Sequence, residues 1–433
     1  MTTLTVGEQE ALAIDGGPRL ITEPLGREWP GTHFIDADER RLVIEALERR
    51  HGLTDDLPPV ARQFFSARWA ASVNSGTGGL FAAIKALDIG PGMEVLVPGI
   101  CWIPTITCVV AHGAIPVLVE VGEDLGMDPA DMERKITRRT KAVIVVHMLG
   151  AAANVAPLME VARRHKLRVI EDCAQDSGGK YNGKFVGLFG DIGVFSLQYN
   201  KHATGYVGGF MISNDKGLGA RAEIARDAGL TRIMHKVTYV PGDDVMWGEG
   251  RLLSPLVQAM AAAQIPKLPK IIESMQRAQQ RIKEGLAGIE GIRFRPHATA
   301  DSLSGSFMVT YWPTEETARK AADALRAEGV PEWTHHIATY GTHIYSQMPM
   351  LTRKVGYVPG SSWPWDAPEN AQSQYSYEKG ALPKSDEIFS RGVLMAVPSN
   401  LTDSQCDQIA AAYRKVIHHL LPNSVQAAPE HAS

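Results

Sequence analysis

The sequence shows no block of basic residues, no apolar run of membrane-spanning length and no signal-peptide pattern at its start. It has 433 residues, with 44 Lys and Arg against 48 Asp and Glu, and no block of basic residues stands out. A nucleic-acid partner would require such a basic stripe. No apolar run reaches the roughly 18 residues of a membrane-spanning helix, and the N-terminus has neither region of a signal peptide. We therefore expect a cytoplasmic globular protein that binds neither nucleic acid nor a membrane.

Cysteine is scarce, and its spacing suggests no metal or disulfide framework. The four cysteines are Cys101, Cys108, Cys173 and Cys406. None forms the C-x-x-C pair of a zinc or redox motif. The adjacent His335 and His336 have no third ligand in register. We therefore expect no metal site.

Short apolar runs alternate with amphipathic segments between about residues 67 and 213. The runs at 143–146 and 168–170 are apolar on both faces, as central strands are, and residues 155–165 between them have helical periodicity. Strands that alternate with helices predict βαβ units. We therefore predict an α/β fold whose mostly parallel central sheet is sandwiched by helices.

The pattern changes after about residue 255. Residues 255–288 predict one long helical region that Pro266 and Pro269 should kink or break. The elements that follow predict a smaller α+β domain, with strands at 307–311 and 393–396 and helices at 315–328 and 403–420.

These changes divide the chain into four parts. The parts are an N-terminal segment that packs on the small domain (1–60), a large cofactor-binding domain (61–255), a small C-terminal domain (256–421) and a disordered tail (422–433). The stretch 340–384 is long for a loop, and long ordered loops are often functional or interfacial.

A glycine- and threonine-rich turn joins the expected strand at 69–73 to a helix. Its sequence, NSGTG (74–78), offers backbone N–H groups and the positive end of a helix dipole to an anion, most often a phosphate. In the alternative interpretation, Ser75 and Thr77 only cap the helix.

Asp172 and Lys201 follow two further strands of the expected sheet. Ligand sites of open α/β sheets lie at the carboxyl ends of strands. A buried carboxylate there needs a partner, and for Asp172 alone a salt bridge or a helix cap is the alternative. Lys201 follows the apolar run 192–196 and precedes a glycine-rich loop. A partly desolvated lysine has a lowered pKa and can attack carbonyls, whereas most loop lysines are solvated.

A phosphate-binding turn, a strand-end carboxylate and a nucleophilic lysine together match the needs of pyridoxal phosphate. The lysine would form the Schiff base, the turn would bind the phosphate, and the carboxylate would pair with the pyridinium nitrogen. A protonated ring nitrogen makes the ring an electron sink.

The order and spacing of these motifs resemble the DegT/DnrJ/EryC1/StrS family of sugar aminotransferases, within the fold-type I superfamily. The resemblance covers most of residues 70–215 and is most specific at EDCAQ (171–175) and at FSLQ followed by Lys201 (195–201). It implies a fold-type I transferase with pyridoxal 5'-phosphate as cofactor, acting as a homodimer with the active site at the interface.

The resemblance also implies roles for individual residues. Lys201 is similar to the lysine that forms the Schiff base and moves the proton, and Asp172 to the partner of the pyridine nitrogen. Gln175 is expected near the cofactor's O3′, and Trp102 is expected on the pyridine ring unless it is a core aromatic. His147 is expected to pack beneath the site. The expected residues around the phosphate are Ser75, Gly76, Thr77 and Ser196.

Two positions depart from the family pattern. After the lysine the family usually reads T-x-G-E-G-G, and here Val207 replaces the Glu. The family's G-x-N-[FY]-R, whose Asn reaches the partner subunit's phosphate, is GEGR (248–251) here. Because a carboxylate would repel a phosphate, either this loop is rearranged or Glu249 binds substrate. Candidate substrate residues by proximity to motifs are Tyr199, His202, Tyr206, Glu249, Arg251, His335 and His336.

Three hypotheses follow for the function. The run ALAIDGGPRL (11–20) and Trp102 are similar to cyclitol aminotransferases of aminoglycoside pathways, which favours an aminotransferase that moves an amino group from glutamine or glutamate to a keto-cyclitol or keto-sugar. The alternative is an enzyme of this fold that epimerises, eliminates or dehydrates an amino sugar or amino acid. A catalytically silent relative is the third, based on Val207 and Glu249.

Overall fold

A seven-stranded sheet forms the centre of the larger part of the protein in the computed structural model, which describes residues 10–26, 29–49, 55–233, 236–238 and 245–422. Its strands are β1 (Trp69–Val73), β2 (Glu94–Pro98), β3 (Ile115–Val119), β4 (Thr140–Val146), β5 (Arg168–Asp172), β8 (Ile192–Ser196) and β9 (Gly209–Ser213). They lie in the order β1-β9-β8-β5-β4-β2-β3. Strand β9 runs antiparallel to both its neighbours, and the strands from β8 to β3 pair in parallel. The prediction of a mostly parallel sheet in an α/β fold is therefore confirmed.

Alternate side chains of the strands enter two apolar cores, one on each face of the sheet. Val143 and Val145 of β4 lie in one core with Leu158, whereas Ile144 lies in the other with Ile84. This alternation follows from the two-residue period of a strand. One core is covered by α5 (Gly76–Ala86), α6 (Pro104–Ala111) and α9 (Lys216–Arg226), and the other by α4 (Leu57–Phe65), α7 (Pro129–Arg134) and α8 (Val155–Arg164).

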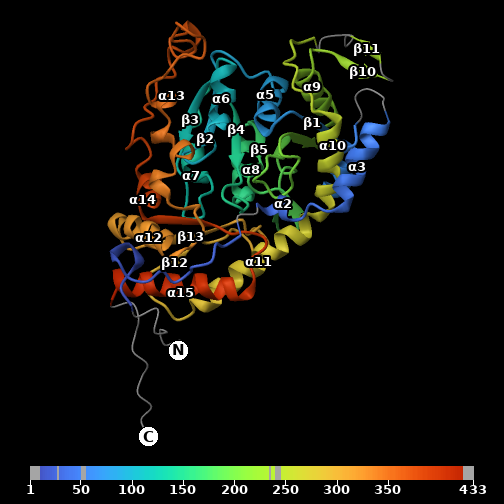
Figure 1. Ribbon diagram of the computed structural model, residues 1–433. Coiled ribbons are helices and arrows are strands. Elements are labelled where there is room, and N and C mark those ends of the chain that lie inside the picture. The colour runs from blue at the N-terminus through green and yellow to red at the C-terminus, as the bar shows by residue number, and fades with distance from the viewer. Residues whose placement is uncertain (1–9, 27–28, 50–54, 234–235, 239–244, 423–433) are drawn as a thin grey trace.

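A smaller α+β unit lies below the large sheet in Figure 1. Its antiparallel sheet has the order β12-β13-β15-β14. The predicted helices over 315–328 and 403–420 are confirmed. The elements of this unit are β12 (Arg293–Phe294), β13 (Phe307–Tyr311), β14 (Thr334–His336), β15 (Gly392–Ala396), α12 (Glu315–Glu328) and α15 (Asp403–Leu420).

One interrupted helix connects the two units, as its prolines predict. Helix α10 (Pro255–Gln264) ends in a 3-10 turn that contains Pro266, and α11 (Leu268–Gly285) begins with Pro269 in its first turn. Proline is tolerated in a first turn because its missing N–H would be unpaired there. Figure 1 shows α11 running from the large sheet towards α15.

The N-terminal residues contact both units. Leu12, Ile21 and Leu25 join the apolar core of the small sheet, whereas α3 (Ala37–Glu48) lies beside α10 (Figure 1). The four-part division of the chain stays a prediction, and its tail after residue 422 lies outside the described residues. Within the described ranges, no helix is long and apolar enough to cross a membrane.

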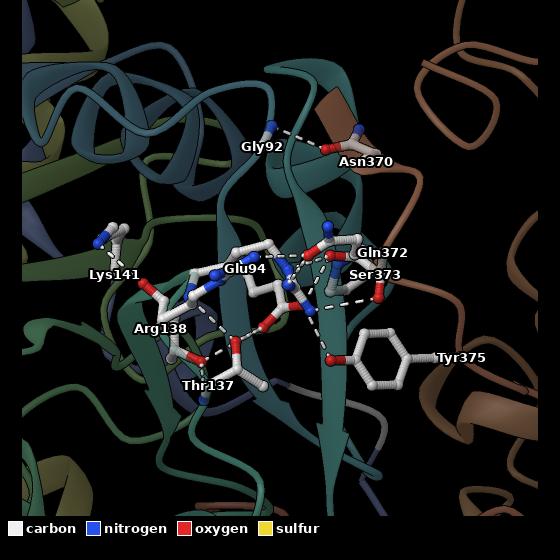
Figure 2. A network of polar contacts seen from close by, with 12 residues as sticks. Gly92, Glu94, Thr137, Arg138, Lys141, Asn370, Gln372, Ser373 and Tyr375 are labelled. Carbon is white, nitrogen blue, oxygen red and sulfur yellow. Dashed lines mark hydrogen bonds and ion pairs between the residues drawn. The ribbon is translucent and has the colours of Figure 1, made fainter. Parts of the chain in front are cut away.

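The segment after β14 returns along the side of the large sheet where β3 lies (Figure 1). It includes α13 (Pro349–Thr352) and α14 (Pro383–Arg391). Figure 2 shows how it is fastened: the buried carboxylate of Glu94 accepts hydrogen bonds from Ser373 Oγ at 2.6 Å and Tyr375 OH at 2.9 Å. Arg139 Nε lies 3.0 Å from the same carboxylate oxygen. One buried acid on β2 therefore holds this long segment against the sheet.

Candidate active site

A cavity of about 500 Å³ opens at the carboxyl ends of the parallel strands, where ligand sites of α/β sheets lie. Asp172 is the last residue of β5 and Ser196 is the last residue of β8. The cavity brings together all eight residues that the sequence suggested for the cofactor. They are Ser75, Gly76, Thr77, Trp102, Asp172, Gln175, Ser196 and Lys201.

The N-terminus of α5 forms one wall of the cavity. Ser75 is the N-cap residue, and its hydroxyl accepts a hydrogen bond from Gly78 N at 2.9 Å. A Cβ on Gly76 would lie 3.1 Å from Cβ of Ser196, so a larger residue would have to push α5 and the end of β8 apart by a few tenths of an ångström. The capping interpretation is therefore correct for Ser75, and the turn nevertheless presents a helix N-terminus to the cavity.

Asp172 is a buried acid with two hydrogen-bond donors. Its Oδ2 accepts from Thr105 Oγ1 at 2.8 Å and its Oδ1 from Ala174 N at 3.1 Å. Burial raises the pKa of Asp172, although these donors and the charge of Lys201 oppose the shift. A buried carboxylate in this state gains stability from any additional cationic donor.

Lys201 lies in a loop just beyond β8. Its carbonyl accepts a hydrogen bond from Gly31 N at 3.1 Å, and its N–H donates to Gln198 O at 3.0 Å, so both sides of its backbone are fixed. Burial lowers the pKa of Lys201 to about 8, and the charge of Asp172 opposes that shift. A lysine with this pKa is partly neutral near pH 7.5 and can act as a nucleophile.

Five further aromatic rings form much of the cavity wall, and the sequence analysis had named only Tyr199 among them as a candidate. Trp29 contacts Trp333 at 5.0 Å and Tyr199 at 6.0 Å between ring centroids, each edge to face. Tyr340 stacks on His343 at 4.2 Å. All five rings line the cavity. For Tyr340 and His343 the one sequence signal was the unusual length of the 340–384 segment, which pointed to a functional loop without identifying a residue, and Trp29 and Trp333 carried no such signal.

Glu249 and Arg251 do not line the cavity. Oε2 of Glu249 is 2.5 Å from Arg251 Nε, and its Oε1 is 3.3 Å from His112 Nε2. Arg251 also lies over the Phe81 ring at 4.3 Å. Burial acts to raise the pKa of Glu249, but His112 and Arg251 outweigh burial and lower it to about 2. The carboxylate is therefore paired with Arg251 of its own loop and lies beside His112, directly after α6, instead of lining the cavity.

The candidate residues in the loop around Lys201 differ in whether they line the cavity. Val207 and His202 line the cavity, whereas Tyr206 does not and is 55% exposed. Tyr206 has a positive φ of 64°, which turns its side chain out of the strand path. His336 Nε2 bonds to Ser390 O at 2.6 Å within the small unit.

The residues beneath the site form a closed hydrogen-bond network. His147 Nε2 is 3.1 Å from Glu171 Oε2, and His147 Nδ1 accepts from Ala153 N at 3.2 Å. Glu171 also accepts backbone N–H groups from Gly187, Phe189 and Gly190. Cys173 lies close enough to complete a cluster with metal-like spacing. Because the ring nitrogens and carboxylate oxygens already have protein partners, this cluster supports the strand ends.

Comparison with known proteins gives the family. The sequence model of the DegT/DnrJ/EryC1/StrS aminotransferase family matches residues 51–362. L-glutamine:2-deoxy-scyllo-inosose aminotransferase of Micromonospora echinospora is 32% identical over 378 residues, covering 81% of this chain and 85% of that protein. GDP-perosamine synthase of Vibrio cholerae is 30% identical over 384 residues, covering 87% of this chain and 95% of that protein.

A solved structure shares the fold. It is that of Helicobacter pylori PseC, an aminotransferase involved in the biosynthesis of pseudoaminic acid, with a TM-score of 0.76 and 17% identity over 92% of this chain and 100% of that chain. The chain therefore belongs to the DegT/DnrJ/EryC1/StrS aminotransferase family and is an aminotransferase. A different reaction type and a catalytically silent relative are set aside.

Proposed function

We propose that this aminotransferase uses pyridoxal 5'-phosphate to move an amino group from glutamine or glutamate to a keto-cyclitol or keto-sugar. When bound, the cofactor supplies an aldehyde that captures amines and a ring that stabilises negative charge on the neighbouring carbon. The observation that carries the proposal is the meeting of Lys201, Asp172 and the α5 N-terminus in one cavity.

The donor set of the cavity fits this cofactor. A helix N-terminus that glycine opens to the cavity suits a phosphate. The buried Asp172 carboxylate has two neutral donors and would be stabilised by a protonated ring nitrogen. We therefore assign the phosphate to Ser75, Gly76, Thr77 and Ser196, the ring nitrogen to Asp172, and the aldehyde to Lys201, with Trp102 and Gln175 beside the ring.

Lys201 has two tasks in this proposal. Because burial lowers the pKa of its amine to about 8, about a fifth of Nζ is neutral at physiological pH and can bind the aldehyde carbon. Once an amino substrate has displaced it, the same neutral Nζ can accept a proton from the carbon that bears the amino group. It can then donate that proton to the carbon on the other side of the nitrogen. Asp172 stays charged opposite the ring nitrogen, and the buried site limits access of water.

The cavity wall suits a polyhydroxylated ring as amino acceptor. Trp29 and Trp333 offer flat apolar faces for the C–H side of such a ring, and Asn200 and Ser306 offer an amide and a hydroxyl for its OH groups. The Micromonospora relative is named for a 2-deoxy-scyllo-inosose substrate. We therefore propose a keto-cyclitol first, within secondary-metabolite biosynthesis of the aminoglycoside type, and a keto-sugar second.

We further propose a cytoplasmic homodimer with the active site at the subunit interface. Trp247 is 87% exposed and Val245 is 73% exposed, immediately before the Glu249 loop. Large apolar side chains this exposed are typical of an interaction surface. In such a dimer, Tyr206, Glu249 and Arg251 would lie towards the partner's substrate, which keeps them as substrate candidates.

Borohydride trapping of the enzyme incubated with pyridoxal 5'-phosphate, followed by peptide mapping, tests the proposal. We expect the label on Lys201, and we expect Lys201→Ala to lose both the label and the absorbance near about 420 nm. Lys216→Ala, at the exposed start of α9, is the matched control. A label on another residue, or none, would refute the cofactor assignment.

The donor and acceptor are tested separately on the holoenzyme. Glutamine should convert the visible band to one near about 330 nm, and a keto-cyclitol should then restore it. Restoration by nucleotide-linked keto-sugars alone would refute the cyclitol assignment and leave the keto-sugar one.

A further inference from the structure

His343 reaches the cavity from the segment that follows the small sheet. Its carbonyl accepts a hydrogen bond from Cys101 N at 3.0 Å, which fixes it beside the loop after β2. Its ring lies 4.9 Å from the Trp102 ring and stacks on Tyr340 at 4.2 Å with an interplanar angle of 14°. Two aromatic neighbours and a backbone bond therefore hold the imidazole in one orientation.

His343 and Gln175 meet inside this cavity through nitrogen atoms. Nε2 of Gln175 is 3.3 Å from Nε2 of His343, and Oε1 of Gln175 accepts a hydrogen bond from Leu149 N at 3.1 Å. Because a backbone N–H can only donate, we assign the Gln175 oxygen to Leu149 and its NH₂ group to His343. Nε2 of His343 must then be the acceptor, so the ring is neutral with its proton on Nδ1.

The neutral state agrees with the surroundings of the ring. Burial, and secondly the charge of Lys201, lower the pKa of His343 to about 4, and a backbone hydrogen bond to Tyr340 opposes the shift. The ring therefore keeps its acceptor throughout the physiological range.

We propose that His343 is a positioning residue that holds the Gln175 carboxamide so that its second N–H points into the cavity as a donor to the cofactor's phenolic oxygen. A carboxamide nitrogen carries two hydrogens. One is used by His343, which leaves the other for the cavity. The inference rests on the proposed function, because it requires the pyridoxal ring to lie on the side of the cavity where Gln175 lies.

Two substitutions of His343 separate the effect of its hydrogen-bond acceptor from the effect of its aromatic ring. His343→Phe keeps a ring that can stack on Tyr340 but removes the acceptor, so the Gln175 amide loses one of its two anchors. His343→Gln removes the ring but keeps an oxygen that can accept from Gln175. Gln175→Leu removes the donor itself, and His165→Phe, on the exposed end of α8, controls for loss of a histidine.

Two readouts on the purified enzymes test the inference. They are the dissociation constant for pyridoxal 5'-phosphate and the pH midpoint of the visible absorbance of the bound cofactor. We expect His343→Phe to weaken cofactor binding about three- to tenfold, the range of one neutral hydrogen bond, and to move the midpoint by about 0.5 to 1 unit. His343→Gln and His165→Phe should stay within about twofold of the unsubstituted enzyme.

The double variant His343→Phe, Gln175→Leu decides between positioning and general packing. If His343 acts through Gln175, the double variant matches Gln175→Leu in both readouts. Additive effects, or a His343→Phe variant with unchanged affinity and midpoint, would overturn the inference. Borohydride labelling of Lys201 in the unsubstituted enzyme keeps this outcome distinct, because absence of that label refutes the cofactor proposal instead.

Discussion

Asp176 should make the stability of the protein fall as the pH rises. It follows Gln175 directly, is fully buried, and neither carboxylate oxygen has a hydrogen-bond partner in the described part of the chain. A Cβ on Gly179 would lie 2.1 Å from Oδ2, so the loop is closed tightly around the acid. Burial raises the pKa of Asp176 from 3.8 to about 7, and His147, Ser304 and Arg295 oppose burial without cancelling it.

The direction and size of the effect follow from that pKa. Between pH 3.8 and about 7 the Asp176 carboxyl group loses its proton in the unfolded chain but keeps it in the folded protein. The free energy of unfolding therefore decreases as the pH rises. A rise of about three units at 1.36 kcal/mol each corresponds to about 4 kcal/mol in total, of which about 3 kcal/mol falls between pH 5 and pH 8. Asp176→Asn cannot ionise and should not show this loss.

Urea unfolding at pH 5 and pH 8, at one protein concentration, measures the difference. Asp176→Asn should be within about 1 kcal/mol of the unsubstituted protein at pH 5 and more stable by about 2 to 3 kcal/mol at pH 8. Asp407→Asn is the control, because Arg281 lowers the pKa of Asp407 from 3.8, so its contribution is nearly complete by about pH 5 and does not change towards pH 8. A stability difference for Asp176→Asn that is equal at both pH values would refute the reasoning.

Four further substitutions test other parts of the structure. Glu94→Ala should lower the free energy of unfolding by about 3 to 5 kcal/mol in urea, because it leaves the buried donors of Figure 2 without their acceptor. Gly76→Ala should weaken cofactor binding about tenfold in a titration, because its Cβ would press on Ser196, whereas Gly217→Ala in exposed α9 should not. Glu249→Gln should lower the free energy of unfolding by about 1 to 2 kcal/mol at pH 7. In thermal melts this difference from the unsubstituted protein should vanish as the pH falls from 4.5 to about 2, because the folded protein lowers the pKa of Glu249 to about 2. If the proposed homodimer forms through this surface, Trp247→Glu should shift the sedimentation coefficient from that of a dimer to that of a monomer.

The sequence predicted elements whose local signals agree with their tertiary surroundings. Helices α12 and α15 begin with capping boxes at Thr314 and Thr402, and both span the predicted residues. The break before α11 follows from Pro266, which removes a backbone donor and clashes with the preceding turn, and a 3-10 turn takes the place of α-helix there. Strand β14 (Thr334–His336) was not predicted because three polar-rich residues carry no apolar alternation, and only pairing with β15 makes them a strand.

The residues of the site also differ in whether a local sequence signal predicts them. Lys201 and Asp172 could be found because Asp172 ends one apolar strand and Lys201 lies in the loop that follows another, and parallel strands bring their carboxyl ends to one edge. His343, Trp29 and Trp333 could not, because they arrive from segments without strand or helix periodicity. Their positions depend on long-range contacts, such as the backbone bond between Cys101 and His343, which leave no mark on local sequence.

The two departures from the family pattern have different consequences in the fold. Glu249 is an acid that pairs with its own Arg251 outside the cavity, so its charge need not disturb a phosphate on α5. Val207 does line the cavity, and it places an apolar side chain where the resemblance implies a carboxylate. Asp172 is then the acid that faces Lys201, and its charge opposes the shift that burial causes in the lysine pKa. An added carboxylate at position 207 would raise that pKa and reduce the neutral amine, so Val207→Glu should move the acid-side midpoint of cofactor capture to higher pH.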